Sequence, residues 1–189
     1  MPSGNGGKSR RSSCRRWEAA ATTDSLEGTE GVVDHHSRDV RVQEDEAIDA
    51  VFRQLQDRLL RYQIFPPRIM RAEVCSDDGR IHEGTTIVQH VAIGPLRMEA
   101  AVRVVRVWRG ETEEAEEIGF TYATLEGHPE RGISTFRLRR SALGSITFLI
   151  DTRSRPGSLL TRLARPLARR FQLRATEAAL RYFTAAGHR

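Results

Sequence analysis

The sequence has 189 residues, a formal net charge of +5 and 39% hydrophobic residues, which suits a single domain with one core. It contains no run of 18 apolar residues, which excludes a transmembrane helix. The basic residues near the start are not followed by an apolar stretch, which argues against a secretory signal. We therefore expect a cytoplasmic protein without stable membrane insertion.

The two cysteines, Cys14 and Cys75, have no paired spacing of the kind that a disulfide framework shows. They are predicted to be free thiols in a reducing compartment. No CxxC or HExxH pattern is present, so we expect no metal site and no cofactor.

Residues 1–37 are rich in Gly, Ser, Thr and charged residues and lack a sustained apolar period. Such a segment cannot bury enough apolar surface to offset the entropy lost on ordering, so it is predicted to be a disordered tail. Its basic residues permit contact with nucleic acid, but acidic residues follow closely, and a solvated tail is the favoured interpretation. The folded domain is then expected to span residues 38–189, beginning with a short strand at residues 38–42.

An amphipathic helix is predicted for residues 44–62, because apolar residues recur there at three- and four-residue spacing. Acidic residues in its first turn favour the helix dipole, and Pro66 and Pro67 prevent its continuation. The apolar stripe consists of Ile48, Val51, Phe52, Leu55, Leu59 and Tyr62.

Strands follow in a meander, indicated by alternating and β-branched runs that are separated by turn residues. The expected strands cover residues 68–75, 85–91, 96–107, 118–122, 134–140 and 145–151. In the run from Leu96 the apolar phase slips by one residue at Val105, which predicts a β-bulge and hence a curved sheet.

A long helix is predicted for residues 158–184, with Ser158 as its cap and Pro166 causing a kink or a restart one turn in. Its apolar stripe is accompanied by many arginines. A solvated arginine face is the favoured interpretation. Binding of this basic helix to anionic lipid or nucleic acid is the alternative, although few aromatic residues are interleaved for stacking on bases, and we expect no nucleic-acid partner.

Charged residues, a histidine, a proline and glycines are most concentrated in residues 118–132, which run Ile-Gly-Phe-Thr-Tyr-Ala-Thr-Leu-Glu-Gly-His-Pro-Glu-Arg-Gly. Three interpretations are open. Its glycines and proline can serve a structural turn. Its polar side chains can line the mouth of a cavity and orient a ligand. His128 can act as a general base that is oriented by Glu126 or Glu130, although no nucleophile or second acid-base pair accompanies it.

The string from Gly119 to Gly132 resembles the signature of uncharacterised protein family 0548, a bacterial and plant family. Ser154-Arg155-Pro156 before the arginine-rich helix is a second, weaker match, and the similarity covers residues 38–184. The family is similar to the helix-grip superfamily of lipid-transfer and polyketide-cyclase proteins, which implies a ligand cavity. The chain departs from the family pattern in having Ala123 and the run Ile133-Ser134-Thr135, and in lacking a tyrosine-rich entry.

The resemblance implies an α+β helix-grip domain, in which a curved antiparallel sheet wraps a long C-terminal helix and one N-terminal helix is added. We expect it to bind a small apolar molecule between the sheet and the C-terminal helix. The expected ligand-binding residues are Tyr122, His128, Glu130 and Arg131, and no catalytic residue is assigned. The alternatives are a cyclase- or hydrolase-like enzyme using the same cavity, and a peripheral membrane or interaction protein acting through its basic helix.

Overall fold

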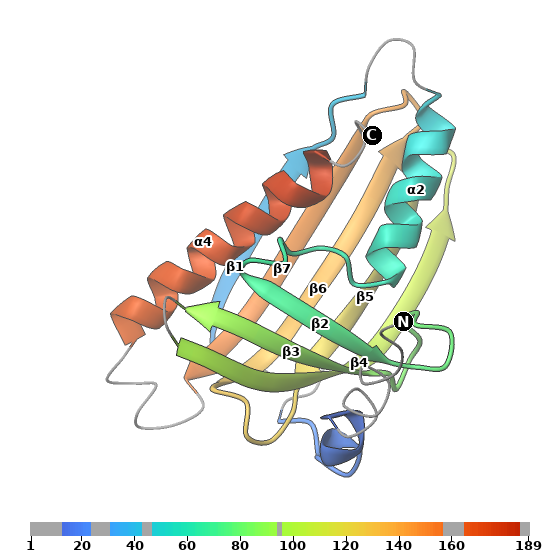
Figure 1. The fold of residues 1–189 in the computed structure, drawn as a ribbon. Coiled ribbons are helices and arrows are strands. Elements are labelled where there is room, and N and C mark those ends of the chain that lie inside the picture. Colours follow the sequence, from blue (N-terminus) through green and yellow to red (C-terminus); the bar gives the residue numbers. More distant parts are fainter. Residues whose placement is uncertain (1–12, 24–30, 43–46, 94–95, 157–164, 186–189) are drawn as a thin grey trace, which may run out of the picture.

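The computed structural model describes residues 13–23, 31–42, 47–93, 96–156 and 165–185 (Figure 1). The elements in chain order are β1 (Val32–Asp39), α2 (Ile48–Leu60), β2 (Met70–Cys75), β3 (Thr86–Ile93), β4 (Leu96–Glu111), β5 (Ala115–Thr124), β6 (Glu130–Ser141), β7 (Ile146–Pro156) and α4 (Arg165–Thr184).

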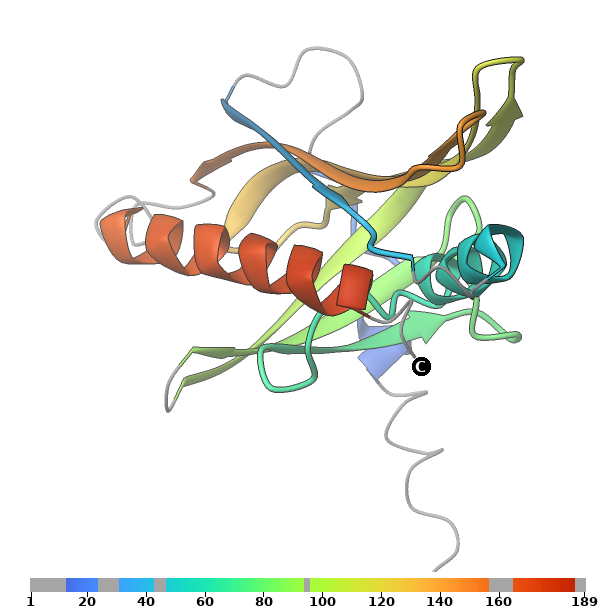
Figure 2. The same ribbon diagram turned by 90° about the horizontal axis from the view of Figure 1, so that it is seen from above.

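All seven strands form one antiparallel sheet in the order β1-β7-β6-β5-β4-β3-β2. Each strand from β2 to β7 therefore lies beside its neighbour in sequence, and β1 joins at the far edge next to β7. Figure 2 shows the sheet curving around α4. The predicted α+β helix-grip architecture is confirmed.

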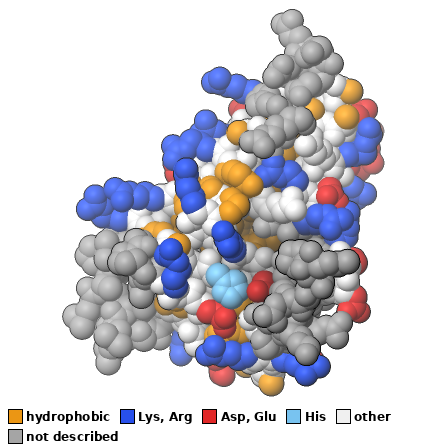
Figure 3. Space-filling view, viewed as in Figure 1, with side chains coloured by type: hydrophobic (Ala, Val, Ile, Leu, Met, Phe, Trp, Pro, Cys, Tyr) orange, Lys and Arg blue, Asp and Glu red, His pale blue; other side chains and the backbone are white. Residues whose placement is uncertain are grey.

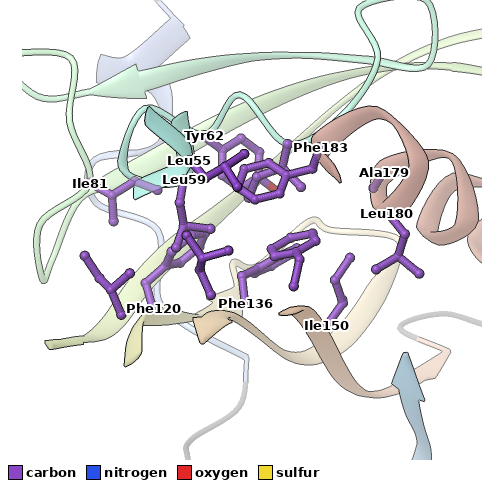
Figure 4. Packing of buried hydrophobic residues seen from close by; sticks show 14 of the residues in the cluster. Leu55, Leu59, Tyr62, Ile81, Phe120, Phe136, Ile150, Ala179, Leu180 and Phe183 are labelled. Carbon is purple, nitrogen blue, oxygen red and sulfur yellow. The ribbon is translucent and has the colours of Figure 1, made fainter. Parts of the chain in front are cut away.

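The core lies between the concave face of the sheet and the two helices, which both cover that face (Figures 1 and 4). Phe120, Phe136 and Phe148 are cross-strand neighbours or near neighbours on β5, β6 and β7, and all are fully buried. Figure 4 shows Leu55 and Leu59 of α2 and Phe183 of α4 packing over this surface. The stripe predicted for α2 lies in the core except for Ile48, which is exposed. In α4 the predicted Ala175 and Ala178 are buried, but the predicted Tyr182 is 37% exposed, and Ala179, Leu180 and Phe183 are the residues that close the core.

The predicted β-bulge is confirmed. Val104 of β4 pairs with Tyr122 of β5, but the next pair is Arg106 with Thr121, so Val105 is the extra residue. A bulge increases local twist and bends a strand, which helps this sheet curve around α4.

Helix α2 is shorter than predicted, and α4 is described only from Arg165. Helix α2 begins at Ile48, preceded by Ala47, and ends at Leu60; residues 43–46 lie outside the described residues. Tyr62 follows with φ +55°, and the amides of Tyr62 and Gln63 bond to the carbonyls of Leu59 and Arg58. This is a Schellman ending with tyrosine at the position usually held by glycine. Helix α4 has Pro166 in its first turn, where a missing N–H is tolerated, and the proposed Ser158 cap lies outside the described residues.

The expected disordered tail is wrong for the described residues before position 38. Residues 31–37 lead into and form most of β1, which pairs with β7 along eight residues. Residues 13–23, here called the N-terminal strap, begin with a helical turn at 13–17, and Thr22 forms an isolated bridge with Leu125, directly after β5. Trp17 is buried in a second apolar cluster with Val88, Ala101 and Leu125. The described residues before position 38 are ordered by individual side-chain contacts and by backbone pairing, and neither produces an apolar period in the sequence.

The prediction of free thiols is also wrong, because Cys14 of the strap and Cys75 of β2 form a disulfide with a Cα–Cα distance of 5.7 Å. Arg103 of β4 adds three hydrogen bonds, from its guanidinium to the carbonyls of Trp17, Glu18 and Ala20. Because both cysteines are bonded, they no longer argue for a reducing compartment, and the cytoplasmic location stays a prediction.

Candidate functional site

A row of polar residues crosses the otherwise apolar concave face of the sheet. Tyr122 of β5 pairs with Ser134 of β6, Ser134 with Thr152 of β7, and Thr152 with Asp34 of β1. Cross-strand partners share a face, so these four side chains lie on one line, which we call the polar row. The hydroxyls of Ser134 and Thr152 are 3.3 Å apart.

Tyr62 and Gln89 extend the polar row from the opposite side of the core. The Nε2 of Gln89 donates a hydrogen bond of 2.7 Å to the Oη of Tyr62, and both residues are buried. The ring centroids of Tyr62 and Tyr122 are 6.4 Å apart. The segment after α2 and the strands β3, β5 and β6 therefore bring two phenols, one amide and one hydroxyl together in the interior.

Both phenols are neutral at physiological pH. Burial raises the pKa of Tyr62 well above its usual value, and the neighbouring Tyr122 raises it further. Burial also raises the pKa of Tyr122; hydrogen bonds with Ser134, Tyr62 and Gln89 oppose that rise, and the carboxylate of Glu130 adds to it. The two hydroxyls can therefore donate and accept hydrogen bonds but do not act as phenolate bases.

Tyr62 is held in a strained backbone conformation. A non-glycine residue in the left-handed region costs about 1 kcal/mol or more and persists where its surroundings determine it. Here the surroundings are aromatic: the Tyr62 ring lies 5.9 to 6.4 Å from the rings of Phe65, Phe120, Tyr122 and Phe136. In this backbone conformation the Tyr62 side chain points into the core, and its hydroxyl lies beside Gln89.

The turn at residues 124–132 is held by close backbone contacts, and its two glycines serve different purposes. Gly127 has φ +89°, a conformation that favours glycine. At Gly132 the backbone of β7 lies so close that a Cβ would collide with the carbonyl of Arg153, so only glycine fits there. The Oγ1 of Thr124 accepts a hydrogen bond of 3.0 Å from the amide of Gly132 and closes the turn. These contacts support the structural interpretation of the segment.

His128 is tied to the turn through its own neighbour. Its Nδ1 lies 3.0 Å from the amide nitrogen and 2.8 Å from the carbonyl oxygen of Glu130. Whichever tautomer is present, the backbone of Glu130 occupies Nδ1, which leaves Nε2 as the nitrogen available to a ligand. Withdrawal of the ring from water lowers the pKa of His128 to about 4, although the contact with Glu130 acts in the opposite direction.

The four residues predicted to bind ligand do not all point to one place. Tyr122 and Glu130 are close enough for the Glu130 charge to act on the Tyr122 hydroxyl. His128 lies in the turn beside Glu130. Arg131 follows Glu130 on β6, so its side chain leaves the opposite face of the sheet and is exposed. The structure therefore brings together three of the four, with Arg131 apart.

Known proteins share this architecture. The family model of DUF1990, a domain of unknown function, matches residues 19–182 of this chain. The chain belongs to the DUF1990 family. The match includes part of the N-terminal strap, all of β1 and the whole sheet, so the family domain begins well before residue 38. No curated protein matches the sequence significantly.

Solved structures share the fold of this DUF1990 protein at low sequence identity. The hypothetical protein jhp0584 of Helicobacter pylori has a TM-score of 0.58 and 11% identity, covering 90% of this chain and 100% of that one. The Zhui aromatase/cyclase of a Streptomyces species has a TM-score of 0.53 and 17% identity, covering 84% and 94%. The Thermus thermophilus protein TTHA0849 has a TM-score of 0.54 and 10% identity, covering 82% and 97%. The helix-grip resemblance inferred from the sequence is confirmed.

Three interior residues of this DUF1990 protein were not singled out from the sequence: Tyr62, Gln89 and Ser134. Tyr62 was assigned to the apolar stripe of the helix, because its φ is not visible in a periodic pattern. Gln89 and Ser134 did carry a signal. Each is the polar member of an inward-facing set, Ile87-Gln89-Val91 and Ser134-Phe136-Leu138, which strand alternation defines.

Two surface grooves of the DUF1990 domain are lined by described residues. One, of about 410 Å³, lies between residues 66–68 and α4. The other, of about 640 Å³, lies between α2, residues 80–82 and the strands β4 and β5. Within the described residues, no group of His, Cys, Asp and Glu side chains is arranged to hold a metal ion. None of the helices described has the length and apolar content to cross a bilayer.

His128 is expected to make this protein less stable as the pH falls from 7 to 5. Its pKa is about 4 in the folded state and about 6.5 in an unfolded chain, so the unfolded state binds the extra proton in that window. The stability is fully present above pH 6.5, and at most about 2 kcal/mol of it is lost by pH 5. Urea unfolding at the two pH values should show this loss.

The matched comparison is His128→Asn, which removes the titrating group. The variant should show a smaller fall in the free energy of unfolding between pH 7 and pH 5 than the wild type. An equal fall in both proteins would mean that His128 is not withdrawn from water in the folded state.

Proposed function

We propose that this protein binds a small, largely apolar molecule between the concave face of the sheet and α4, with Tyr62, Tyr122, Gln89 and Ser134 as its polar anchor. The observation that carries the proposal is this polar group within an aromatic core, in which Tyr62, Gln89 and Ser134 are buried and Tyr122 is half-buried. Buried polar atoms cost free energy unless they are paired, and a core needed only for stability is better filled with apolar side chains.

The surroundings of the anchor suit an apolar ligand. The rings of Phe120 and Phe136 are stacked with centroids 5.1 Å apart, and Tyr122 lies 5.5 Å from Phe136. Small side chains of α4, Ala175 and Ala179, are buried on its sheet-facing side. Specific ligand sites are mostly apolar with a few placed polar groups, and this interior has that composition.

Glu130 and His128 are proposed to lie at the end of the polar row, where Nε2 of His128 and the carboxylate of Glu130 can meet a polar group of the ligand. Arg131 is left out of the proposed site because it leaves the other face of β6. The shared fold with an aromatase/cyclase supports a small organic molecule as the ligand class. Because the phenols are neutral and His128 has a lowered pKa, the groups present favour hydrogen bonding over proton abstraction at neutral pH.

Native mass spectrometry of the protein purified from its own host tests the proposal. The wild type should carry a small molecule at an equimolar ratio. Tyr122→Phe removes one hydroxyl from the anchor and should lower the retained fraction about fivefold or more, because a ligand group then loses its partner.

Tyr182→Phe is the matched control, since Tyr182 lies at the surface of α4 and is 37% exposed. It should retain ligand like the wild type. A wild type that carries no small molecule, or a Tyr122→Phe variant that retains it fully, would argue against the interior site. Turnover of the released molecule by the wild type would instead support the cyclase- or hydrolase-like alternative.

A further inference from the structure

The groove beside α4 has an apolar floor and a basic rim. Residues 66–68 form one wall and α4 forms the other, and the floor is made by Pro66, Pro67, Ala178 and the ring of Tyr182. Figure 3 shows hydrophobic surface on this face of the molecule with arginine side chains around it. The groove lies outside the proposed interior site and does not depend on it.

Both walls are fixed in place by the core. Pro66 and Pro67 restrict the backbone of the first wall, and the carbonyl of Pro66 accepts hydrogen bonds from Ile69 and Met70. In the second wall, Tyr182 precedes Phe183, whose ring centroid is 4.1 Å from that of Phe148. A ligand would therefore enter a preformed groove and would not have to order its walls on binding.

The charge on the rim is positive. Arg68 lies on one wall and Arg181 on the other. Arg181 is paired with Glu177 at 3.2 Å, but the same oxygen of Glu177 also lies 3.5 Å from Arg38. One carboxylate thus serves two guanidinium groups. Arg68 forms no hydrogen bond or ion pair with any residue that the structure describes.

A third guanidinium lies against the aromatic floor. That of Arg58 is 5.2 Å from the ring centroid of Tyr182 and 5.6 Å from that of Phe183, and it also donates to the carbonyl of Gln63. This stacking holds the Tyr182 ring and adds positive charge beside it.

We propose that the groove binds a small amphipathic anion, a single alkyl chain or ring that carries a phosphate or carboxylate. The apolar part would lie on Pro66, Pro67, Ala178 and Tyr182, and the anionic head would lie between Arg68 and Arg181. Guanidinium groups bind such heads with charge-assisted hydrogen bonds. The groove volume of about 410 Å³ is within the range of small-molecule sites.

A membrane surface is a poorer fit than a single molecule. Of the α4 side chains that the structure describes, the exposed large hydrophobic ones are Leu173 and Tyr182, whereas Leu180 and Phe183 are buried. A helix that lies in a bilayer interface needs a continuous exposed apolar face. A concave groove with two opposed arginines instead suits one head group at a time.

The test is titration calorimetry with octyl phosphate below its micelle concentration, with octanoate as the carboxylate probe and 1-octanol as the neutral one. Octyl phosphate should bind the wild type with 1:1 stoichiometry and at least about tenfold more tightly than 1-octanol. Arg68→Gln and Arg181→Gln should each weaken that binding by about tenfold, as expected for the loss of a charge-assisted hydrogen bond. Arg139→Gln, an exposed arginine on β6, is the matched control and should bind octyl phosphate like the wild type.

Three results would overturn the proposal: equal affinity for octyl phosphate and 1-octanol, unchanged affinity in both groove variants, or association with anionic vesicles but not with octyl phosphate. Tyr122→Phe separates this site from the interior one. It should leave octyl phosphate binding unchanged, and a loss in that variant alone would place the probe in the interior and refute the groove.

Discussion

Replacing Cys14 with serine is expected to lower the free energy of unfolding by about 4 kcal/mol, the value that the chain-entropy relation gives for a disulfide closing a loop of this length. The bond joins residues that are 61 positions apart, so it removes much of the freedom of the unfolded chain. It also fixes the strap whose Trp17 side chain covers Val88, Ala101 and Leu125.

Urea unfolding of the wild type and Cys14→Ser, each with and without reducing agent, measures the effect. Reducing agent should destabilise the wild type to the level of the variant and leave the variant unchanged, which separates the bond from other effects of reduction. A wild type that keeps its stability after complete reduction would show that the strap is held by its noncovalent contacts alone.

The strap also supports the turn that carries His128. The Trp17 ring lies 3.5 Å from the position that a Cβ on Gly127 would take, the amide of Glu126 donates to the carbonyl of Ala21, and the hydroxyl of Thr23 meets that of Thr124. Order in the strap therefore contributes to the geometry around Glu130. Loss of the disulfide should raise hydrogen exchange at residues 124–129 before it does so in β6 and β7.

The fold was largely predictable because its core uses regular periods. Alternation placed six of the seven strands within a few residues, and the one-residue slip at Val105 located the bulge. The helical stripes named Leu55 and Leu59, and these residues are fully buried. Periodicity is informative wherever one face of an element is buried and the other is solvated.

The N-terminal region was missed because its order does not come from a period. In β1 the described side chains are half-buried or exposed, so the strand shows no clean alternation. The strap depends on one tryptophan, on backbone carbonyls that accept from Arg103, and on one disulfide. Cysteine spacing cannot predict a bond between residues that meet only after the sheet has formed.

The candidate site was predicted only in part, because some of its residues are far apart in the sequence. Tyr122 and Glu130 lie in the motif that the sequence singles out, and strand register brings them near Ser134. Tyr62 reaches that place only because it adopts the left-handed conformation directly after α2, and Gln89 comes from β3, two strands away from the β5 that carries Tyr122. Sequence motifs identify residues that are close in the chain, whereas this anchor is assembled from four elements.

Phe183→Ala should lower the free energy of unfolding by about 3 to 5 kcal/mol, the range for removing a buried aromatic ring from a packed core. Phe183 is fully buried, its ring packs at a tilt against that of Phe148, and it lies under the guanidinium of Arg58. It is the residue through which the C-terminal half of α4 is held against the sheet, so its loss leaves a cavity between them.

Leu173→Ala on the same helix is the matched control, because Leu173 is 38% exposed and its truncation should cost about 1 kcal/mol or less. Both variants introduce alanine, the best helix former, so helix propensity does not account for a loss of stability, and the difference between the variants measures contact with the sheet. Urea unfolding gives both values, with the slope against urea checking that the unfolded states are comparable. Equal losses in the two variants would mean that the sheet does not hold α4 through Phe183, and the helix-grip account of stability would then be wrong.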